Sequence, residues 1–238
     1  MKLSIIIPAF NEERTILTIL KRIANVRLQS VTKEIIIVND ASTDTTDEKI
    51  RRFLRSFPSW KYVIHKVNQG KGAAVRTGIK KARGEYIIIQ DADLEYHPKE
   101  MKKLLRKLAE SDAQVVYGSR IDRLPNFKQE QRTIRFFVHY LGNRGLSLIT
   151  SILYGQYITD METCYKLIPR RIIVDIPLNA KGFEIEPEIT AKLMKRGHKI
   201  IETSITAVPR GYEEGKKLHT LKDGYKALRA LIKYRFSE

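Results

Sequence analysis

Two aspartates separated by one residue follow an apolar run in the middle of the chain. Asp91 and Asp93 come directly after residues 85–90 (EYIIIQ). On an extended segment, side chains at i and i+2 point to the same side, and the strand rise brings their β-carbons within about 7 Å. Two negative charges this close repel unless one is protonated or a cation lies between them. The spacing therefore predicts a site for a divalent cation with oxygen ligands, with Glu95 as a third ligand.

Acidic side chains also follow two earlier apolar runs. Residues 8–12 (PAFNE) follow residues 3–7, and Asp40 follows residues 34–39 (EIIIVN). The carboxyl ends of parallel strands meet at one edge of a sheet, where ligands of open α/β proteins bind, so we expect Glu12 and Asp40 near Asp91. Asp40 is also explained as a turn residue, and Asp44 is better explained as the N-cap of a helix over residues 45–57.

A glycine-containing segment precedes another predicted helix. Residues 68–78 (NQGKGAAVRTG) lack both the GxxxxGK[ST] pattern of a Walker A loop and the GxGxxG pattern of dinucleotide-binding folds. Gly70 and Gly72 would still allow a close backbone approach, and Lys71 could reach an anionic ligand. The same residues also fit a simple turn into a helix.

A regular alternation of strands and helices must position these residues. Apolar runs predict strands at 3–7, 34–39, 61–67, 85–90 and 114–119, and segments of helical period follow at 13–26, 46–57, 72–82 and 98–108. This alternation predicts an α/β fold with a mostly parallel sheet and helices on both faces. Helical periodicity also covers residues 132–154.

Composition places the chain among globular proteins of a reducing compartment. Hydrophobic residues make up 42% of its 238 residues, which excludes a disordered chain. The single cysteine, Cys164, excludes an intramolecular disulfide and a cysteine-based zinc cluster. The N-terminal apolar run is too short for a signal peptide, and residues 146–158 are too few and too polar for a span of roughly 20 apolar residues. We therefore expect a cytoplasmic protein, soluble or peripheral to a membrane.

The positive charge of the chain requires a partner or a solvated surface. Lys and Arg number 44 against 27 Asp and Glu, a net charge of +17. We expect no nucleic-acid partner, because no nucleic-acid-binding motif accompanies this charge. An anionic membrane is the other option, because residues 219–238 predict a basic amphipathic helix that either contacts a membrane surface or packs on the protein's own core. Its apolar side contains Leu221, Tyr225, Leu228, Leu231, Ile232 and Phe236, and Lys222, Lys226, Arg229 and Lys233 lie off that side.

Several motifs occur in an order that resembles family 2 glycosyltransferases with the GT-A fold. They are PAFNEE, VNDASTDTT, NQGKGAAVRTG, IIIQDADLE and YGSR. In the second half, TDMETCYKL, KGFEIEPEITAKLMKRGHKI and VPRGYEEGKKL resemble the dolichyl- and polyprenyl-phosphate mannose and glucose synthases of this family. The resemblance implies a Rossmann-like GT-A catalytic domain over residues 1–218, followed by the amphipathic helix over 219–238.

The resemblance also implies roles for individual residues. Pro8, Phe10 and Glu12 would hold the nucleotide base and ribose, and Asp40 would contact the base. Phe10 replaces the usual Tyr, which keeps stacking but loses a hydroxyl contact, and Ala41 replaces a usual Gly, which alters the turn. The residues matched to metal, sugar and phosphate binding are Asp91 and Asp93, Glu95 in place of a common Gln, Arg120 near the reacting phosphate, and Arg210 and Lys216 in a loop that closes on the donor diphosphate.

The acceptor decides which further side chains the reaction needs. A sugar hydroxyl would need a carboxylate base, and the candidates are Asp160, Glu184, Glu186 and Glu188. Residues 186–188 also fit a plain helix start. A lipid phosphate is already ionised and needs cations instead, and the candidates are Arg120, Arg132, Arg135 and Arg144. Residues 132–154 would then form either a core-facing helix or a helix at the membrane edge.

The sequence therefore predicts an inverting, Mn²⁺- or Mg²⁺-dependent glycosyltransferase. The preferred reaction moves mannose from GDP-mannose to a polyprenyl (dolichyl) phosphate at the cytosolic face of a membrane. One alternative is a glucosyltransferase that uses UDP-glucose. Two others are a nucleotide-dependent oxidoreductase, which the missing glycine fingerprint disfavours, and a nucleic-acid-binding protein, which only the charge suggests.

Overall fold

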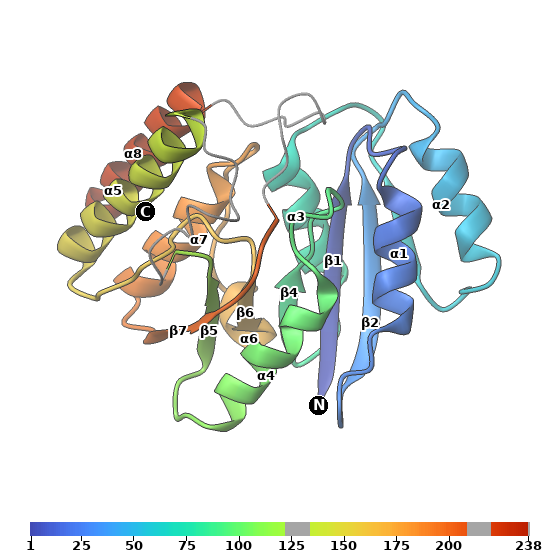
Figure 1. Cartoon of the computed structure of the whole chain (residues 1–238), viewed down its shortest axis with the longest axis horizontal. Coiled ribbons are helices and arrows are strands. Elements are labelled where there is room, and N and C mark those ends of the chain that lie inside the picture. Colours follow the sequence, from blue (N-terminus) through green and yellow to red (C-terminus); the bar gives the residue numbers. More distant parts are fainter. Residues whose placement is uncertain (122–133, 209–219, 238) are drawn as a thin grey trace.

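A seven-stranded sheet with helices on both sides forms the molecule (Figure 1). The computed structural model describes residues 1–121, 134–208 and 220–237, apart from the side chains of 134–139 and 220–222. The strands are β1 (Lys2–Ala9), β2 (Thr32–Asn39), β3 (Lys61–Ile64), β4 (Tyr86–Ile89), β5 (Val115–Ser119), β6 (Lys166–Pro169) and β7 (Ile200–Ser204). The helices are α1 (Ile16–Asn25), α2 (Thr46–Leu54), α3 (Lys71–Lys81), η1 (Pro98–Glu100), α4 (Met101–Ala109), α5 (Ile134–Tyr154), α6 (Arg170–Ile173), α7 (Ile185–Lys195) and α8 (Thr220–Phe236).

The sheet is mostly parallel, in the order β3-β2-β1-β4-β6-β5-β7. Strand β1 pairs in parallel with β2 and β4, and β2 pairs in parallel with β3. Only β6 runs antiparallel to its neighbours β4 and β5. The carboxyl ends of β1, β2 and β4 therefore meet at one edge, as the sequence predicted.

Alternate residues of β1 fill two separate cores. Leu3, Ile5 and Ile7 pack with the buried side chains of α1 and α4. Ile6 faces the other way and packs with those of α3 and α7. All four side chains are fully buried, and each such burial contributes about 1.5–3 kcal/mol. The expected arrangement of helices on both faces is confirmed.

Two strands were absent from the sequence-based expectations. Strand β6 has only four residues, and its first residue, Lys166, interrupts the apolar pattern although its side chain is buried. Strand β7 (IIETS) is only half-buried after its first residue and carries three polar residues. Both lack the continuous apolar run that signals a buried parallel strand.

Helices α5 and α8 lie side by side at the edge of the molecule farthest from α1 and α2 (Figure 1). The Tyr154 hydroxyl of α5 donates to the Leu231 carbonyl of α8 at 2.8 Å. Leu231 and Tyr234 are buried, whereas Ile232 and Phe236 are exposed, so the apolar side expected for the C-terminal helix is divided between the core and solvent. Within the described residues, no helix is long and apolar enough to cross a membrane.

Candidate active site at the carboxyl ends of the parallel strands

Asp91 and Asp93 lie in a tight turn that follows β4. Gln90 Nε2 donates to the Asp91 carbonyl at 3.0 Å, which fixes the start of the turn. Asp93 Oδ1 accepts the backbone N–H of Glu95 at 3.1 Å, and Leu94 has a φ of +70°. The extended backbone inferred from the spacing is therefore wrong, because the chain reverses here. The two carboxylates still interact electrostatically.

The two aspartates ionise differently. Burial, together with the nearby charges of Asp91 and Glu95, raises the pKa of Asp93 to about 7. Burial also opposes ionisation of Asp91, but Lys71, the Cys164 thiol and Lys166 together outweigh it and hold the pKa of Asp91 below its ordinary value. Across the residues that the structure describes, no three His, Cys, Asp or Glu side chains converge on one metal position. Asp91, Asp93 and Glu95 thus form no closed metal cage.

Lys71, the first residue of α3, lies against Asp91. Its Nζ is 2.8 Å from Asp91 Oδ2, 3.1 Å from Cys164 Sγ and 3.4 Å from Glu186 Oε1. Burial alone would lower the pKa of Lys71, but Asp91 and the other acidic groups raise it well above its ordinary value. Lys71 was expected to contact the nucleotide, and here it neutralises the first aspartate of the pair.

A second lysine continues this line of alternating charges into the core. Lys166 Nζ lies 2.6 Å from Glu186 Oε2, and the two side chains are 0% and 3% exposed. We call Lys166, Glu186, Lys71 and Asp91 the buried ionic chain. Cys164 joins it by donating its thiol hydrogen to Asp91 Oδ2 at 2.7 Å. Sequence reasoning missed the roles of Cys164 and Lys166. The sequence offered only a lysine next to the apolar residues that form β6.

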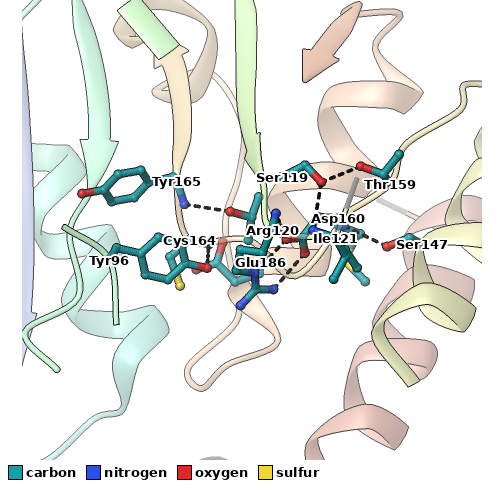
Figure 2. Close-up of polar contacts among 12 residues, drawn as sticks. Tyr96, Ser119, Arg120, Ile121, Ser147, Thr159, Asp160, Cys164, Tyr165 and Glu186 are labelled. Carbon is teal, nitrogen blue, oxygen red and sulfur yellow. Dashed lines mark hydrogen bonds and ion pairs between the residues drawn. The ribbon is translucent and has the colours of Figure 1, made fainter. Parts of the chain in front are cut away.

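Arg120 and Asp160 form a bidentate ion pair beside the same sheet edge (Figure 2). Arg120 Nε and Nη2 lie 2.7 and 2.8 Å from the two Asp160 oxygens, and the Arg120 backbone N–H donates to Asp160 Oδ2 at 2.9 Å. The guanidinium also lies over the Tyr96 ring, 5.7 Å from its centroid. Asp160 is fully buried. Because both oxygens are bound to a cation, Asp160 is poorly suited to act as the base considered from the sequence.

Glu162 is a carboxylic acid that sequence reasoning missed. Its Oε1 is buried and has no hydrogen-bond partner in the part of the chain that the structure describes. Burial raises the pKa of Glu162 to about 7, although Lys166 and Arg120 act in the opposite direction. An unpaired buried carboxyl oxygen next to the two ion pairs can accept a hydrogen bond from a ligand. Nothing in the sequence distinguished this glutamate from other polar loop residues.

The ends of β1 and β2 hold the residues matched to nucleotide binding. Pro8 is buried within β1, Phe10 is half-buried just after it, and the buried Glu12 accepts a hydrogen bond from the Thr15 hydroxyl at 2.8 Å. Ala41 has a φ of +58°, a backbone conformation that favours glycine. The turn thus keeps the left-handed geometry expected for the usual Gly despite the Ala side chain.

Asp40 is occupied by several internal donors. Its carboxylate accepts the backbone N–H groups of Gln69 and Gly70 at 2.9 and 2.7 Å, and His65 Nδ1 lies 2.6 Å from Oδ1. Asp40 is 2% exposed. These partners lie 25 to 30 residues farther along the chain, so Asp40 joins the end of β2 to the start of α3 and does not make the local turn considered from the sequence.

The glycines before α3 are required by a close backbone approach. A Cβ on Gly70 would lie 2.3 Å from the Lys181 carbonyl oxygen, and a Cβ on Gly72 would lie 2.6 Å from that of Ala180. The Gly72 N–H donates to the Lys181 carbonyl at 2.8 Å. These contacts support the alternative that the segment is a turn into a helix, packed against the loop that leads into α7.

The remaining sequence candidates are placed only in part. Arg132, Arg210 and Lys216 lie outside the described residues, as does the side chain of Arg135. Arg144 Nη1 donates to the Ile121 carbonyl at 3.4 Å, next to Arg120. Among the other base candidates, Glu184 accepts the N–H of Gly182 at 2.9 Å, and Glu188 binds the N–H of Ala180 at 2.7 Å and Lys192 Nζ at 2.7 Å. Glu186 and Glu188 both lie in the first turn of α7, as the helix-start alternative predicted.

Comparison with known proteins identifies relatives of this chain by sequence. A protein of Methanocaldococcus jannaschii described only as uncharacterized is 30% identical over 96% of this chain and 90% of its own length. The dolichyl-phosphate β-glucosyltransferase ALG5A of Trichomonas vaginalis is 30% identical over 85% of this chain. The dolichol-phosphate mannosyltransferase of Pyrococcus furiosus is 28% identical over 91% of it. The chain spans 64% and 59% of the length of these two enzymes.

The fold is shared with a solved structure. Glucosyl-3-phosphoglycerate synthase from Mycobacterium tuberculosis superposes with a TM-score of 0.74 at 18% identity, over 100% of this chain and 79% of the other. The family model described as glycosyl transferase family 2 matches residues 4–176. The resemblance inferred from the sequence is therefore confirmed, and the chain belongs to glycosyl transferase family 2.

Proposed function

We propose that this glycosyltransferase moves a hexose from a nucleotide sugar to a polyprenyl phosphate with inversion at the anomeric carbon. The observation that carries the proposal is the acidic pair at the end of β4, in which Lys71 neutralises Asp91 while Asp93 has a raised pKa. An acidic pair at the ligand-binding edge suits a donor diphosphate held through a cation. The names of the ALG5A and Pyrococcus furiosus relatives support a dolichyl-phosphate acceptor.

Asp91 and Asp93 fit a divalent cation. Mg²⁺ is commonly bound by one or two carboxylates together with substrate phosphates, and within the described residues Asp93 has no ion pair like the one that Asp91 forms with Lys71. When bound, Mn²⁺ or Mg²⁺ neutralises charge on the leaving diphosphate. The solved structural neighbours were crystallised with these ions and UDP, which supports the assignment. Arg210 and Lys216 lie outside the described residues, and we propose that they close on the same diphosphate.

Arg120 is the described cation best placed for the acceptor phosphate. Asp160 engages its Nε and Nη2 and fixes the plane of the guanidinium. Since Arg has five N–H donors, others stay available to an anion, and the side chain is 20% exposed. A phosphate acceptor is already ionised and needs no base, which agrees with the cation pairing of Asp160, Glu186 and Glu188.

The proposal also names the sugar nucleotide that serves as donor. We expect mannose from GDP-mannose, with UDP-glucose as the alternative; the two named relatives are a mannosyl- and a glucosyltransferase. Thermal unfolding with GDP, UDP and their sugars, each with and without Mn²⁺, ranks the donors because a ligand that binds only the folded state raises Tm. A larger shift with UDP-glucose would overturn the mannose assignment.

The metal role is tested by Asp93→Ala. We expect the variant to fold and to lose divalent-dependent transfer to polyprenyl phosphate by at least about a hundredfold, since removing a group that stabilises developing charge has effects of this size. Asp112→Ala, at an exposed position before β5, is the matched control. Full activity of Asp93→Ala, or of the unaltered protein in EDTA, would refute the metal role.

A hydroxyl acceptor is the second candidate, because Glu162 has an unpaired buried oxygen and a pKa of about 7. A general base works best when its pKa lies near the operating pH. Glu162→Gln decides between the acceptors. With a phosphate acceptor, kcat should stay within a few-fold of the original. With a hydroxyl acceptor, kcat should fall about a hundredfold or more and the acidic limb of its pH profile should disappear.

A lipid acceptor also determines where the protein works. Polyprenyl phosphates reside in bilayers, so we propose a cytoplasmic protein that is peripheral at the cytosolic face of a membrane. The positive charge of the chain supports this location, because cytosolic leaflets are anionic.

A further inference from the structure

Helix α5 exposes a line of apolar side chains. Leu141, Leu148 and Ile152 are 51%, 58% and 73% exposed, and their spacing of seven and four residues puts them on one face of the helix. Gly145 lies on the same face, where an added Cβ would meet nothing within 4 Å. Residues 140–154 contain one basic and no acidic residue. This face is therefore apolar, and no part of the described chain covers it.

Helix α8 exposes a second apolar line with the same spacing. Tyr225, Ile232 and Phe236 are 68%, 46% and 80% exposed. Single exposed apolar side chains are ordinary, but contiguous ones on a soluble surface commonly mark a binding site. Helices α5 and α8 lie side by side (Figure 1), and we call their two exposed apolar lines together the α5–α8 face.

Both lines point away from the body of the protein. The opposite sides of the two helices share one buried cluster, in which Leu146 and Leu153 of α5 and Ala230 and Leu231 of α8 pack around Ala191 of α7. Because the inner sides meet the same cluster, the outer sides face solvent together. The α5–α8 face is thus presented by a packed layer, not by a loose terminal helix.

Basic residues dominate the charge of α8, where Asp223 in the first turn is the single acidic residue. Residues 225–237 contain Lys226, Arg229, Lys233 and Arg235 and no acidic residue, and all four side chains are exposed. At 100° per residue, Arg229, Lys233 and Lys226 lie progressively farther around the helix from Phe236. Apolar side chains flanked by lysine and arginine are the pattern of helices that lie in the surface of an anionic bilayer.

We propose that the α5–α8 face docks flat on an anionic lipid bilayer. Charge complementarity favours this occupant over a second copy of the chain. Lys226 lies 3.7 Å from Asp223 of the same helix, but pairing two such faces would still bring Arg229, Lys233 and Arg235 of one copy against the same residues of the other. The inference deepens the proposed function, because it names the surface through which the protein would reach a lipid acceptor. Arg144 of α5 contacts the Ile121 carbonyl next to Arg120, so the docking layer is joined directly to the candidate acceptor site.

Vesicle sedimentation tests the charge component. The probes are vesicles of phosphatidylcholine alone and of phosphatidylcholine with phosphatidylglycerol, without any polyprenyl phosphate. We expect binding to the anionic vesicles only. Arg229→Gln/Lys233→Gln should weaken it about thirtyfold, given the usual contribution of each basic residue at an anionic surface. Lys102→Gln/Arg106→Gln removes two exposed charges from α4 and should bind like the original protein.

The apolar component needs its own variants. Ile232→Ser/Phe236→Ser on α8 and Leu148→Ser/Ile152→Ser on α5 should each weaken binding about tenfold or more, because less apolar area enters the bilayer. Val174→Ser, at a 40% exposed position after α6, is the control. If the α8 pair fails to fold, the α5 pair tests the same face.

The outcomes separate this inference from the proposed function. Equal binding by the original protein and all variants, or no binding to anionic vesicles, would overturn the docking surface. A dimer in sedimentation velocity that Ile232→Ser/Phe236→Ser dissociates would assign the face to a second copy instead. Vesicle binding that depends on the α5–α8 face, in a protein without transferase activity, would support the surface and refute only the function.

Discussion

Replacing Glu186 by glutamine tests whether the buried ionic chain stabilises the fold. Glu186 lies between Lys166 and Lys71, at 2.6 and 3.4 Å, and the side chains of Lys166 and Glu186 are 0% and 3% exposed. Glutamine keeps the shape but removes the negative charge. Among the described residues, Lys166 then has no carboxylate within ion-pair distance, and it is buried from water.

The expected loss follows from this burial. Removing one partner of a buried ion pair costs about 3–5 kcal/mol, because the other charge stays desolvated. For a chain of this size, each kcal/mol lowers Tm by roughly 2–4 °C, so Glu186→Gln should lower Tm on the order of 10 °C. Glu110→Gln provides the control: Glu110 is 60% exposed and faces Arg106 at 3.9 Å, and such surface pairs contribute at most about 1 kcal/mol.

A double variant separates the charge effect from packing. Lys166→Met/Glu186→Leu removes both charges and keeps apolar volume, and such replacements are often neutral or stabilising. We therefore expect urea unfolding to show a large loss for Glu186→Gln and recovery of most of it in the double variant. A loss below about 1 kcal/mol in the single variant, or no recovery in the double one, would refute the view that Lys166 depends on Glu186 for charge compensation.

Two further predictions concern pH and close packing. Burial opposes ionisation of Glu34, but Lys61 and other hydrogen-bond donors lower its pKa to about 2 from an ordinary 4.5; its ionised form thus stabilises the fold above pH 4.5, and the effect is lost as the pH falls toward 2. Glu34→Gln should cost about 1–2 kcal/mol at pH 7 and progressively less below pH 4.5, as urea midpoints would show; a constant difference would contradict the linkage. Gly72→Ala should cost more than about 2 kcal/mol, because its Cβ would lie 2.6 Å from the Ala180 carbonyl oxygen. Gly142→Ala, where an added Cβ on α5 would meet no atom within 4 Å, should be neutral or stabilising by up to about 1 kcal/mol. Thermal melts of the two glycine variants would measure both effects.

The parallel half of the fold could be predicted from the sequence because its signals are local. Residues 34–39 form a continuous apolar run and become β2, and residues 72–82 show helical periodicity and become α3. Strand β6 gave no such signal. Its four residues are specified by antiparallel pairing with β4 and β5, and Lys166 reaches its partner Glu186 only through the tertiary fold.

The candidate site likewise combines features that the sequence could predict with features that depend on the tertiary fold. Residue type and position at a strand end pointed to Asp91 and Asp93, since strand ends can be identified before the fold is known, whereas the family resemblance pointed to Arg120. Pairing could not be identified in this way: Asp160 looked like a free carboxylate in the sequence, yet it is held by Arg120 over a separation of 40 residues. An acidic residue that forms an ion pair with a distant cation is no longer free to act as a base, and the sequence alone does not show which acidic residues do so.

The pairing pattern leaves two carboxyl groups whose charge depends on what binds. Lys166 and Lys71 form ion pairs with Glu186 and Asp91, and Arg120 forms one with Asp160, so each of these carboxylates already faces a cation of the protein. Burial raises the pKa values of Asp93 and Glu162 to about 7, and neither carboxyl forms an ion pair with another residue that the structure describes. A bound divalent cation would lower the first value, whereas an acceptor hydroxyl would use the second. Proton release on binding Mn²⁺ with a nucleoside diphosphate should therefore come mainly from Asp93, and calorimetry in buffers of different ionisation enthalpy would detect its loss in Asp93→Ala but not in Glu162→Gln.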